Sequence, residues 1–314
     1  MKAAEEYNID VPGQMEGTRI DKFLSDYFND MSRSYLQKLI KENYVFVNDK
    51  NVKSNYKLNI SDNIKVIIPE PVTLDIKAEN IELNIVYEDD DIIIVNKPKN
   101  MVVHPAAGHT EGTLVNALLY HCGEKLSGIN GVLRPGIVHR IDKDTTGLIV
   151  ACKNDYAHNF IANQLAEHSI TRTYHAITNG KLADNSGVID KALGRDPFDR
   201  KKIAVVPNGK RAVTHYSVIN NYRNDKFNEN YSYIKCNLET GRTHQIRVHM
   251  ASLKHPLLGD TVYGPQKCHY KTDGQVLHAK TLGFIHPVTN KYIEFDSELP
   301  EYFSNILNNL EIIS

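Results

Sequence analysis

The chain has 314 residues, of which 41% are hydrophobic and 24% are charged, and its net charge at neutral pH is −1. This composition is typical of a soluble globular protein with room for one large domain and a small one, and the near-zero charge argues against a general polyanion binder. No apolar run approaches the ~18 residues of a membrane span. The acidic start MKAAEEYNIDVPG also lacks the apolar core of a secretory signal. We therefore expect a cytoplasmic protein with no membrane partner.

Cysteine spacing and nucleotide-binding motifs give no support for a cofactor. The four cysteines are far apart and form no CxxC pair, so neither a zinc site nor a disulfide framework is indicated. The chain contains no GxxxxGK[ST] and no GxGxxG motif, which removes the usual sequence argument for a nucleotide. We expect no metal and no organic cofactor.

The N-terminal part predicts a tail, residues 1–16, followed by a compact module, residues 17–70. Apolar spacing predicts a helix over 18–30 with Thr18 as its N-cap, and a second helix after Ser32. The stretch YVFVNDKNV predicts a hairpin, and NIKVIIPE predicts a closing strand. Two helices and a few strands in so short a segment make a small α/β domain.

Charge is segregated along this part of the chain. Residues 31–65 hold seven Lys or Arg against three acids, whereas residues 70–91 hold eight acids against only Lys77. A nucleic-acid surface requires such segregation more than it requires a high total charge. Pro69 and Pro71 interrupt the pattern, so residues 71–84 are expected to form a linker.

Residues 85–314 show no second break and predict one α+β domain, with flanking helices on a mainly antiparallel mixed sheet. The expected elements, in chain order, are a hairpin in IVYEDDDIIIVNKP, strand–loop–strand in GIVHRIDKDTTGLIVACK, a helix over 155–168, strands in TRTYHAITNG and YSYIKCNLET, a helix in THQIRVHMASL, a strand pair in FIHPVTNKYIEF, and a terminal helix in PEYFSNILNNL with Pro300 in its first turn.

The sharpest motif is HRIDKDTTG, residues 139–147, which lies between the apolar runs GIV and LIVAC. Buried strands at both ends would hold its side chains at the edge of the sheet. One interpretation is a charged surface loop closed by Gly147. The chemical alternatives are a metal site at His139, Asp142 and Asp144, a glycosidase-like pair of the two aspartates, and a single carboxylate nucleophile. The spacing does not support a metal site, and carboxylates two residues apart rarely flank a scissile bond. The surface loop and the nucleophile stay open.

Two further motifs also allow a structural and a functional interpretation. In GRTHQIRVHM, residues 241–250, Arg247 shares a helical face with Thr243 and Met250. It either makes a structural ion pair on a solvated helix or keeps a catalytic aspartate ionised and oriented. In RTYHA, Tyr174 is expected on a strand, where it either packs in the core or stacks on a flat base within a pocket.

Taken together, these motifs resemble the RluA/RluD-type pseudouridine synthases. HRIDKDTTG is similar to the family signature HRLDxxTSG, with Ile141 for Leu and Thr146 for Ser. The segments RTYHA, GRTHQIRVHM and LHAKTLGFIHP follow in the family's order, and VVHPAAGHTEGTLVNALL is similar to the branch that acts on large-subunit ribosomal RNA. The resemblance covers residues 85–303 and implies the pseudouridine synthase fold.

The resemblance implies a role for each matching residue. Asp142 would be the nucleophile that breaks the glycosidic bond of a uridine, after which the uracil rotates and rejoins the sugar through carbon 5. Tyr174 would stack on the base and help to remove the proton from that carbon, and Arg247 would pair with Asp142. Arg140 would fill the space left by the flipped nucleotide. The remaining expected substrate contacts are His139, Leu277 and Ala279.

The N-terminal module resembles the RNA-binding domain first described in ribosomal small-subunit protein four. The matching segments are RIDKFLSDYF, SRSYLQKLIKENYVFVNDKNV and SDNIKVIIP. The chain departs from that pattern at Glu42-Asn43 and at Ser61, where glycine is usual, although Asn43 tolerates a left-handed turn. The resemblance implies RNA contacts by basic residues of this module, for which the candidates are Arg33, Lys38 and Lys53.

The implied partner is RNA, most specifically large-subunit ribosomal RNA or its precursor particle, bound by a monomer. Two rival functions remain at this point. An RNA-binding protein with an inactive catalytic-like domain would have no evident need for Asp142, Tyr174 and Arg247 together. An N-glycosidase would use the same nucleophile and release free uracil.

Overall fold

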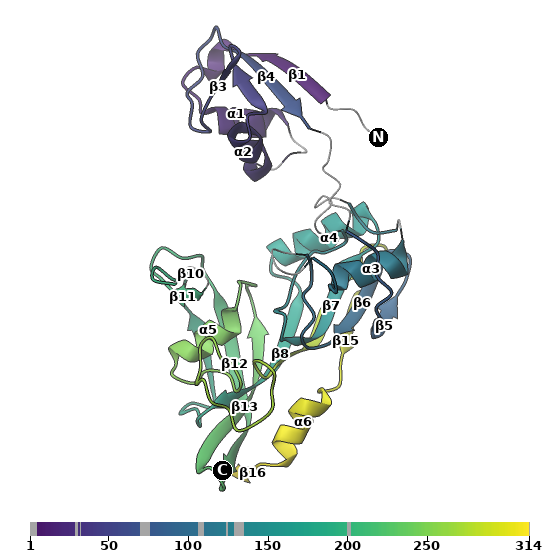
Figure 1. Cartoon of the computed structure of the whole chain (residues 1–314), viewed down its shortest axis with the longest axis vertical. Helices are drawn as coiled ribbons and strands as arrows, with labels where there is room; N and C mark the ends of the chain where they lie inside the picture. Colours follow the sequence, from purple (N-terminus) through teal and green to yellow (C-terminus); the bar gives the residue numbers. More distant parts are fainter. Residues whose placement is uncertain are drawn as a thin grey trace. The chain divides into compact units, whose positions relative to one another are not determined.

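The structure is a computed structural model that describes residues 5–28, 31, 33–69, 76–105, 110–123, 125–128, 135–199 and 202–313. The chain divides into two compact units, Met1–Thr73 and Leu74–Ser314. Figure 1 draws the first in purple and the second in colours from teal to yellow. No helix in these described ranges is long and apolar enough to cross a membrane.

The smaller unit packs two helices against a four-stranded antiparallel sheet. Its elements are β1 (Glu5–Asp10), the 3-10 turn η1 (Gly13–Met15), α1 (Ile20–Tyr27), α2 (Arg33–Lys41), β2 (Val45–Val47), β3 (Lys50–Asn51) and β4 (Asn63–Ile68), and the strand order is β1-β4-β2-β3. Its core joins Leu24 and Leu36 of the helices to Val45, Ile64 and Val66 of the strands.

The predicted hairpin is present, since Asn48 and Asp49 both have positive φ, 48° and 61°, as a two-residue turn of this kind requires. Asn43 has a φ of 63°, so it does adopt the left-handed conformation that its position needs.

Two details of the N-terminal prediction are wrong. The expected tail contains β1, because the backbone of residues 5–10 pairs with β4 and Ile9 is buried in the core; residues 1–4 lie outside the described ranges. Thr18 does not cap the first helix. Arg19 occupies the N-cap position without a side-chain hydrogen bond, and the backbone of Thr18 is instead bonded to Met15 and Leu58.

The elements of the larger unit, in chain order, are β5 (Ile85–Glu88), β6 (Ile92–Lys97), α3 (Leu114–Cys122), β7 (Thr146–Cys152), α4 (Asp155–Ala166), β8 (Thr171–Asn179), β9 (Ser186–Asp190), β10 (Leu193–Arg195), β11 (Ile203–Val205), β12 (Val213–Asn224), β13 (Glu229–Leu238), α5 (Gln245–Ser252), β14 (Leu277–Ile285), β15 (Tyr292–Asp296), α6 (Glu301–Asn308) and β16 (Glu311–Ile313).

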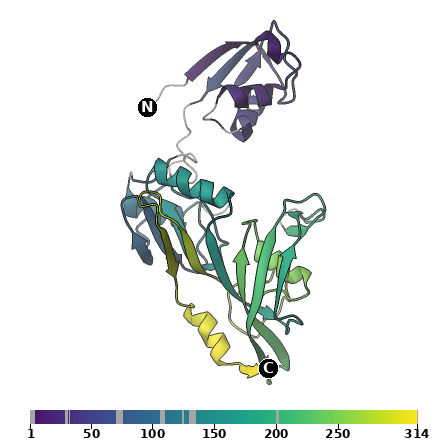
Figure 2. The same ribbon diagram turned by 180° about the vertical axis from the view of Figure 1, so that it is seen from behind.

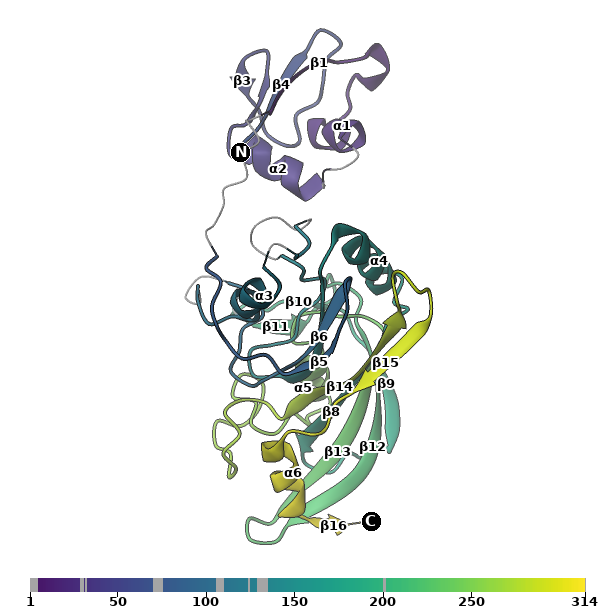
Figure 3. The same cartoon turned by 90° about the vertical axis from the view of Figure 1, so that its right-hand side faces the viewer.

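Ten of these strands form one sheet with the order β16-β12-β13-β8-β14-β7-β6-β5, to which β15 adds on β14 and β9 on β12. Only the pairing of β14 with β7 is parallel among the described strand pairs, so the predicted mainly antiparallel mixed sheet is confirmed. Figure 3 shows β8, β13, β12 and β9 as neighbours. After α6, drawn in yellow in Figure 2, β16 pairs with β12 at one edge.

Both faces of the sheet are buried. Along β6, Ile93 and Val95 join a core with α3 and α5, whereas Ile92 and Ile94 join another core with α4. The helix α6 covers the same sheet farther along, where Phe303 is fully buried against β8 and β13. Alternating residues of the central strands therefore serve two cores, which explains their nearly continuous apolar sequence.

Three expectations for the larger unit need correction. The GIV segment makes only an isolated bridge, Ile137 with Ala151, rather than a strand. Pro300 is the N-cap of α6 and not part of its first turn. The described part of the expected linker, residues 76–84, packs on the larger unit: Ile81 and Leu83 touch its core, and residues 70–75 lie outside the described ranges.

Candidate active site

The loop that carries Asp142 ends where β7 begins, and a buried lysine holds it. Lys97, the last residue of β6, is fully buried, and its ammonium donates to three backbone oxygens, including that of Lys143 at 3.0 Å. Burial lowers the pKa of Lys97 to about 7. The loop is also held two residues farther on, where Gln275 donates to the hydroxyl of Thr145 at 3.0 Å. The segment that directly follows Asp142 is therefore held at two points.

Strand register brings Tyr174 close to the end of this loop. On β14, Ala279 pairs with Tyr174 of β8 on one side and with Gly147 of β7 on the other. Gly147 has a φ of 112°, and a Cβ there would lie 2.2 Å from the carbonyl oxygen of Ala279. Because only glycine tolerates both conditions, the last residue of HRIDKDTTG is required by the junction between β7 and β14.

Arg247 joins two carboxylates. Its Nη1 donates to Oδ2 of Asp142 at 3.0 Å, while its Nε and Nη2 donate to the two oxygens of Asp260 at 2.7 and 2.9 Å. Asp260 is buried, and its Oδ1 also accepts from the backbone nitrogens of Val262 and Tyr263. Burial alone would lower the pKa of Arg247, but Asp260 and then Asp142 raise it above its ordinary value. The guanidinium is therefore a fixed positive charge beside Asp142.

A histidine lies on the other side of the same carboxylate. Nε2 of His244 is 3.9 Å from Oδ1 of Asp142, and its Nδ1 is 2.7 Å from the hydroxyl of Tyr263. That hydroxyl accepts a hydrogen bond from the backbone nitrogen of Ile203 in β11. His244 is the N-cap residue of α5 and has a left-handed φ of 55°. Burial lowers the pKa of His244 below its ordinary value, so the ring is neutral near pH 7.

Two adjoining cavities open beside Asp142. The smaller, of about 50 Å³, has Tyr174, Arg247 and Leu277 in its wall and leaves space for only a few water molecules. The larger, of about 460 Å³, shares Arg140, Asp142 and Tyr174 with the smaller one. Tyr174 is buried, and this burial raises the pKa of its hydroxyl, which is therefore protonated at neutral pH.

The structure thus brings together five of the residues predicted for the site, in the walls of the smaller cavity: Arg140, Asp142, Tyr174, Arg247 and Leu277.

Two predicted contacts are placed differently. His139 lines only the larger cavity, and its Nε2 accepts a hydrogen bond from the backbone nitrogen of Val150 at 3.1 Å. Burial, and then the charge of Arg172, lowers the pKa of His139 to about 3, so its ring is neutral. Ala279 lines neither cavity and instead makes the backbone pairing with Tyr174 described above.

Sequence reasoning missed Asp260, His244, Tyr263 and Lys97. A guanidinium has five N–H donors, so an Arg247 on the buried face of a helix requires a second acceptor beyond Asp142. The sequence therefore indicated that a second acceptor such as Asp260 must exist, although not which residue it is. For Lys97, the signal was a lysine at the end of the apolar run IIIVN, in a strand buried on both faces.

In the smaller unit, buried Asp21 gathers three donors. It accepts hydrogen bonds from Arg19, Arg33 and Gln37, and these bonds, that of Arg19 above all, hold the pKa of Asp21 well below its usual range. Arg33 is about half exposed, so part of its guanidinium faces solvent.

The two predicted lysines of this unit are placed differently from Arg33. Lys38 is exposed, with its Nζ 3.9 Å from a carboxylate oxygen of Glu42. Lys53 borders a shallow cavity of about 550 Å³ beside the β2–β3 hairpin.

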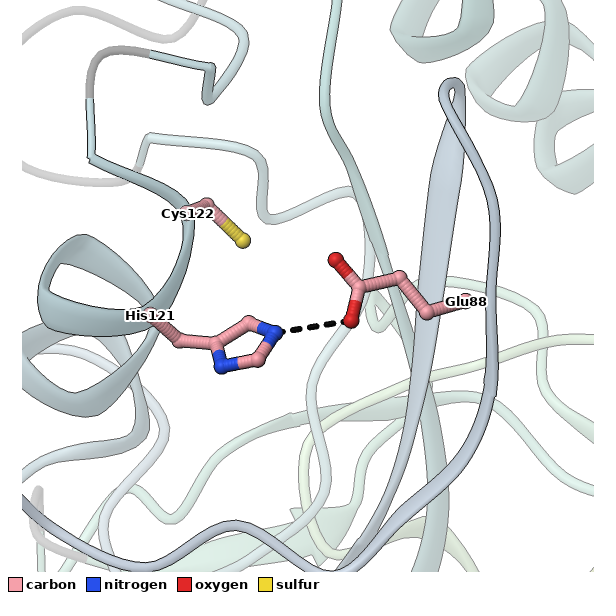
Figure 4. Close-up of side chains that lie close together, drawn as sticks. All are labelled: Glu88, His121 and Cys122. Atoms are coloured by element: carbon pink, nitrogen blue, oxygen red, sulfur yellow. Dashed lines mark hydrogen bonds and ion pairs between the residues drawn. The ribbon is translucent and has the colours of Figure 1, made fainter.

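Among the described residues, two other groups of side chains have the composition of metal ligands. Figure 4 shows Glu88, His121 and Cys122 converging from β5 and the end of α3. His121 and Lys153 take the two carboxylate oxygens of Glu88, at 2.7 and 2.8 Å. The second group is Asp89, Asp91 and His286, in which Asp89 accepts from the imidazole at 2.7 Å and from two backbone nitrogens. Protein donors thus already satisfy the carboxylates of Glu88 and Asp89, and neither group contains Asp142.

Comparison with known proteins identifies both units. Residues 91–252 match the family described as RNA pseudouridylate synthase, and residues 18–64 match the S4 domain. A Bacillus subtilis protein described as an uncharacterized RNA pseudouridine synthase, YlyB, is 48% identical over 96% of this chain and 97% of its own length. The ribosomal large subunit pseudouridine synthase D of Zymomonas mobilis is 47% identical, over 92% of each chain.

Solved structures agree at the level of the fold. Human RNA pseudouridylate synthase domain containing 1 superposes with a TM-score of 0.60 at 23% sequence identity, covering 75% of this chain and 91% of the human one. Human RNA pseudouridylate synthase domain containing 4 gives a TM-score of 0.54, over 74% of this chain and 94% of its own length. From the sequence matches and this shared fold, the chain belongs to the RNA pseudouridine synthase family and carries an S4 domain at its N-terminus.

Proposed function

We propose that the protein converts specific uridines of large-subunit ribosomal RNA to pseudouridine, with Asp142 as the nucleophile. The observation that carries the proposal is the array Asp142–Arg247–Asp260, in which a fixed cation binds one oxygen of Asp142 and leaves the carboxylate at the cavity wall. A carboxylate held in this way is oriented toward whatever enters the cavity.

The proposed chemistry begins at Asp142. Its carboxylate attacks carbon 1′ of the uridine as the bond between that carbon and N1 breaks, and the uracil leaves with the electron pair. The ring then turns, and carbon 5 displaces the carboxylate from carbon 1′. Carbon 5 loses its proton with assistance from the Tyr174 side of the cavity, and N1 takes up a proton. Because the reaction is redox-neutral and releases no group, the substrate and product have the same composition and the carboxylate is regenerated.

The smaller cavity is too small for a base as it stands. Arg140 is exposed and lines both cavities, and the described structure records no hydrogen bond or ion pair for its side chain. It is therefore the wall residue most able to move, which suits the role of filling the stack after the uridine has flipped out. Large-subunit ribosomal RNA is proposed as the substrate because the relative from Zymomonas mobilis bears that name.

The test uses large-subunit ribosomal RNA with tritium at carbon 5 of uridine. We expect the protein to release tritium without free uracil, and Asp142→Asn to abolish release, because an amide is not a nucleophile for this step. Asp144→Asn is the matched control: it changes a carboxylate of the same loop that lines neither cavity, and we expect most activity to remain. Free uracil would identify an N-glycosidase, absence of turnover on any RNA would identify a binding protein, and equal loss in both variants would remove the special role of Asp142.

The S4 domain is proposed to add RNA affinity through charge. Deletion of residues 1–73 is expected to weaken RNA binding and to flatten its dependence on salt, because fewer phosphates are then neutralised. The measurement is the dissociation constant at several salt concentrations. An identical slope for the truncated protein would show that this domain does not contact phosphate.

A further inference from the structure

Arg172 is a buried cation without a protein counter-ion. It precedes Tyr174 by two positions on β8, it is 8% exposed, and it lines the larger cavity. Its guanidinium makes one hydrogen bond, from Nη2 to the backbone oxygen of Glu239 at 3.0 Å, and its Nε is buried without a partner. Within the described ranges, no carboxylate lies within ion-pair distance of it. Because burial of an uncompensated charge is costly, this arrangement favours the binding of an anionic ligand beside Arg172.

The cavity around Arg172 has an excess of positive charge. Its wall includes three arginines, Arg140, Arg172 and Arg242, and a single carboxylate, that of Asp142. Asp142 is already paired with Arg247. A cavity lined mainly by one sign of charge attracts the opposite sign.

The backbone beside Arg172 leaves room for its guanidinium. At Gly241, a Cβ would lie 2.6 Å from Nη1 of Arg172, so the absence of a side chain allows the guanidinium to rest against the chain there. Nη1 makes no protein hydrogen bond in the described structure, and it is not among the buried atoms without a partner. One face of the fork is thus available to a ligand.

The position of the cavity indicates which anion it receives. It shares Asp142 and Tyr174 with the smaller cavity, so an anion bound there adjoins a nucleotide placed for attack by Asp142. We propose that Arg172 forms a subsite for a phosphodiester next to the target uridine. The proposal rests on the proposed function for the identity of the nucleotide. The guanidinium fork matches the geometry of phosphate oxygens, and binding neutralises a charge that folding leaves without a partner.

A double-mutant cycle that combines Arg172→Gln with a methylphosphonate linkage in the RNA tests the contact directly. Binding is measured with the Asp142→Asn protein, so that no chemistry is needed, on an RNA in which one linkage beside the target uridine is a neutral methylphosphonate. We expect the substitution at one of the two linkages to weaken binding roughly tenfold. Arg172→Gln should weaken binding of unmodified RNA by a similar factor and lower the salt slope by about one. In this variant, that methylphosphonate should cause no further loss of binding. Additive effects at both linkages would overturn the proposal.

Stability measurements separate this role from a structural one. A structural Arg172 would lower the melting temperature when replaced, whereas removal of an uncompensated buried charge leaves it equal or raises it. Inorganic phosphate at constant ionic strength should raise the melting temperature of the unchanged protein more than that of Arg172→Gln. This measurement requires no RNA turnover, so it separates failure of the subsite from failure of the proposed function. Equal stabilisation of the two proteins would count against an anion site.

Two further variants complete the design. Arg223→Gln removes an exposed arginine that is paired with Asp225, and we expect it to behave as the unchanged protein in every measurement. Gly241→Ala keeps the charge of Arg172 but displaces Nη1, so it should weaken RNA binding through the same linkage. Normal binding by Gly241→Ala, with the same cost for each methylphosphonate as in the unchanged protein, would contradict the placement of the phosphate at Nη1.

Discussion

Asp260 binds Arg247 through both of its carboxylate oxygens, at 2.7 and 2.9 Å, and thereby orients the one remaining nitrogen that reaches Asp142. The cation beside the proposed nucleophile is therefore in place before any RNA binds. A preorganised charge of this kind costs no rearrangement at the moment of reaction.

Asp260→Asn should reduce turnover on the order of 100-fold, because a small displacement of Arg247 misaligns Asp142. It should also lower the free energy of unfolding by about 3 kcal/mol, since one partner of a buried pair loses its charge. Single-turnover tritium release and denaturant unfolding measure the two effects. Asp225→Asn, which changes an exposed partner of Arg223, is the control. Full activity in Asp260→Asn would show that Asp142 does not depend on the orientation of Arg247.

Tyr174→Phe should leave RNA affinity almost unchanged and slow the chemical step. The ring proposed to stack on the base is kept, whereas the hydroxyl proposed to assist proton removal is lost. The dissociation constant and the single-turnover rate separate these two contributions. Tyr216→Phe removes a phenol hydroxyl from the same sheet outside both cavities and should not change the rate. Equal rates for Tyr174→Phe and the unchanged protein would exclude the hydroxyl from the mechanism.

Gly147→Ala should destabilise the larger unit by about 3 kcal/mol or more. The new Cβ would lie 2.2 Å from the backbone oxygen of Ala279, at a φ of 112° that side chains rarely adopt. Gly128→Ala meets no atom within 4 Å and has no positive φ, so its melting temperature should stay within a degree or so of the original. Thermal unfolding of both variants gives the comparison, and similar melting temperatures would disprove the close approach of β7 and β14.

The stability of the S4 domain should depend on acid through Asp21. Arg19, and then Gln37 and Arg33, hold its folded-state pKa below the unfolded value of about 3.9. Asp21 therefore makes its full contribution to the stability of the domain above the unfolded-state pKa. This contribution is lost as the pH falls from there through the folded-state pKa.

Asp21→Asn should cost about 3 kcal/mol at neutral pH and remove this acid dependence. Hydrogen exchange of the α1 and α2 amides in the full chain, corrected for the intrinsic rate, reports the change. Asp26→Asn, at an exposed position of the same helix, is the control. If protection is lost in acid as steeply in Asp21→Asn as in the unchanged protein, the acid dependence comes from another group.

Elements with strong periodicity could be predicted from the sequence, and those without it could not. The helix α4 and the β5–β6 hairpin follow from apolar spacing alone. In contrast, β12 contains the polar run around Asn220 and Asn221, where a register shift interrupts the alternation with β13. The strand β1 is mostly exposed and carries acids, so its role depends on the backbone of β4. Such edge pairings are tertiary effects and leave little trace in local sequence.

Residues of the candidate site that lie within a motif could be predicted from the sequence. Residues that reach the site from distant parts of the chain were missed. Asp142 and Arg247 lie in motifs with dense polar residues, whereas Asp260 and Lys97 act through contacts that depend on the fold. Nothing in the local sequence around Gly259 and Asp260 indicates that the carboxylate faces Arg247. Ala279 shows the reverse case, in which a residue expected at the pocket contributes through its backbone pairing.

The place of β14 between β7 and β8 has a consequence for the order of synthesis. Asp142 precedes β7 and Tyr174 lies on β8, and in the described sheet β14 lies between these strands and pairs with both. A ribosome making this chain has therefore produced nine-tenths of it before Leu277–Ile285 can be inserted. Until that strand emerges, the nascent protein contains Asp142 and Tyr174 but cannot align them. The proposed site is therefore assembled late in translation, long after the S4 domain at the N-terminus has been made.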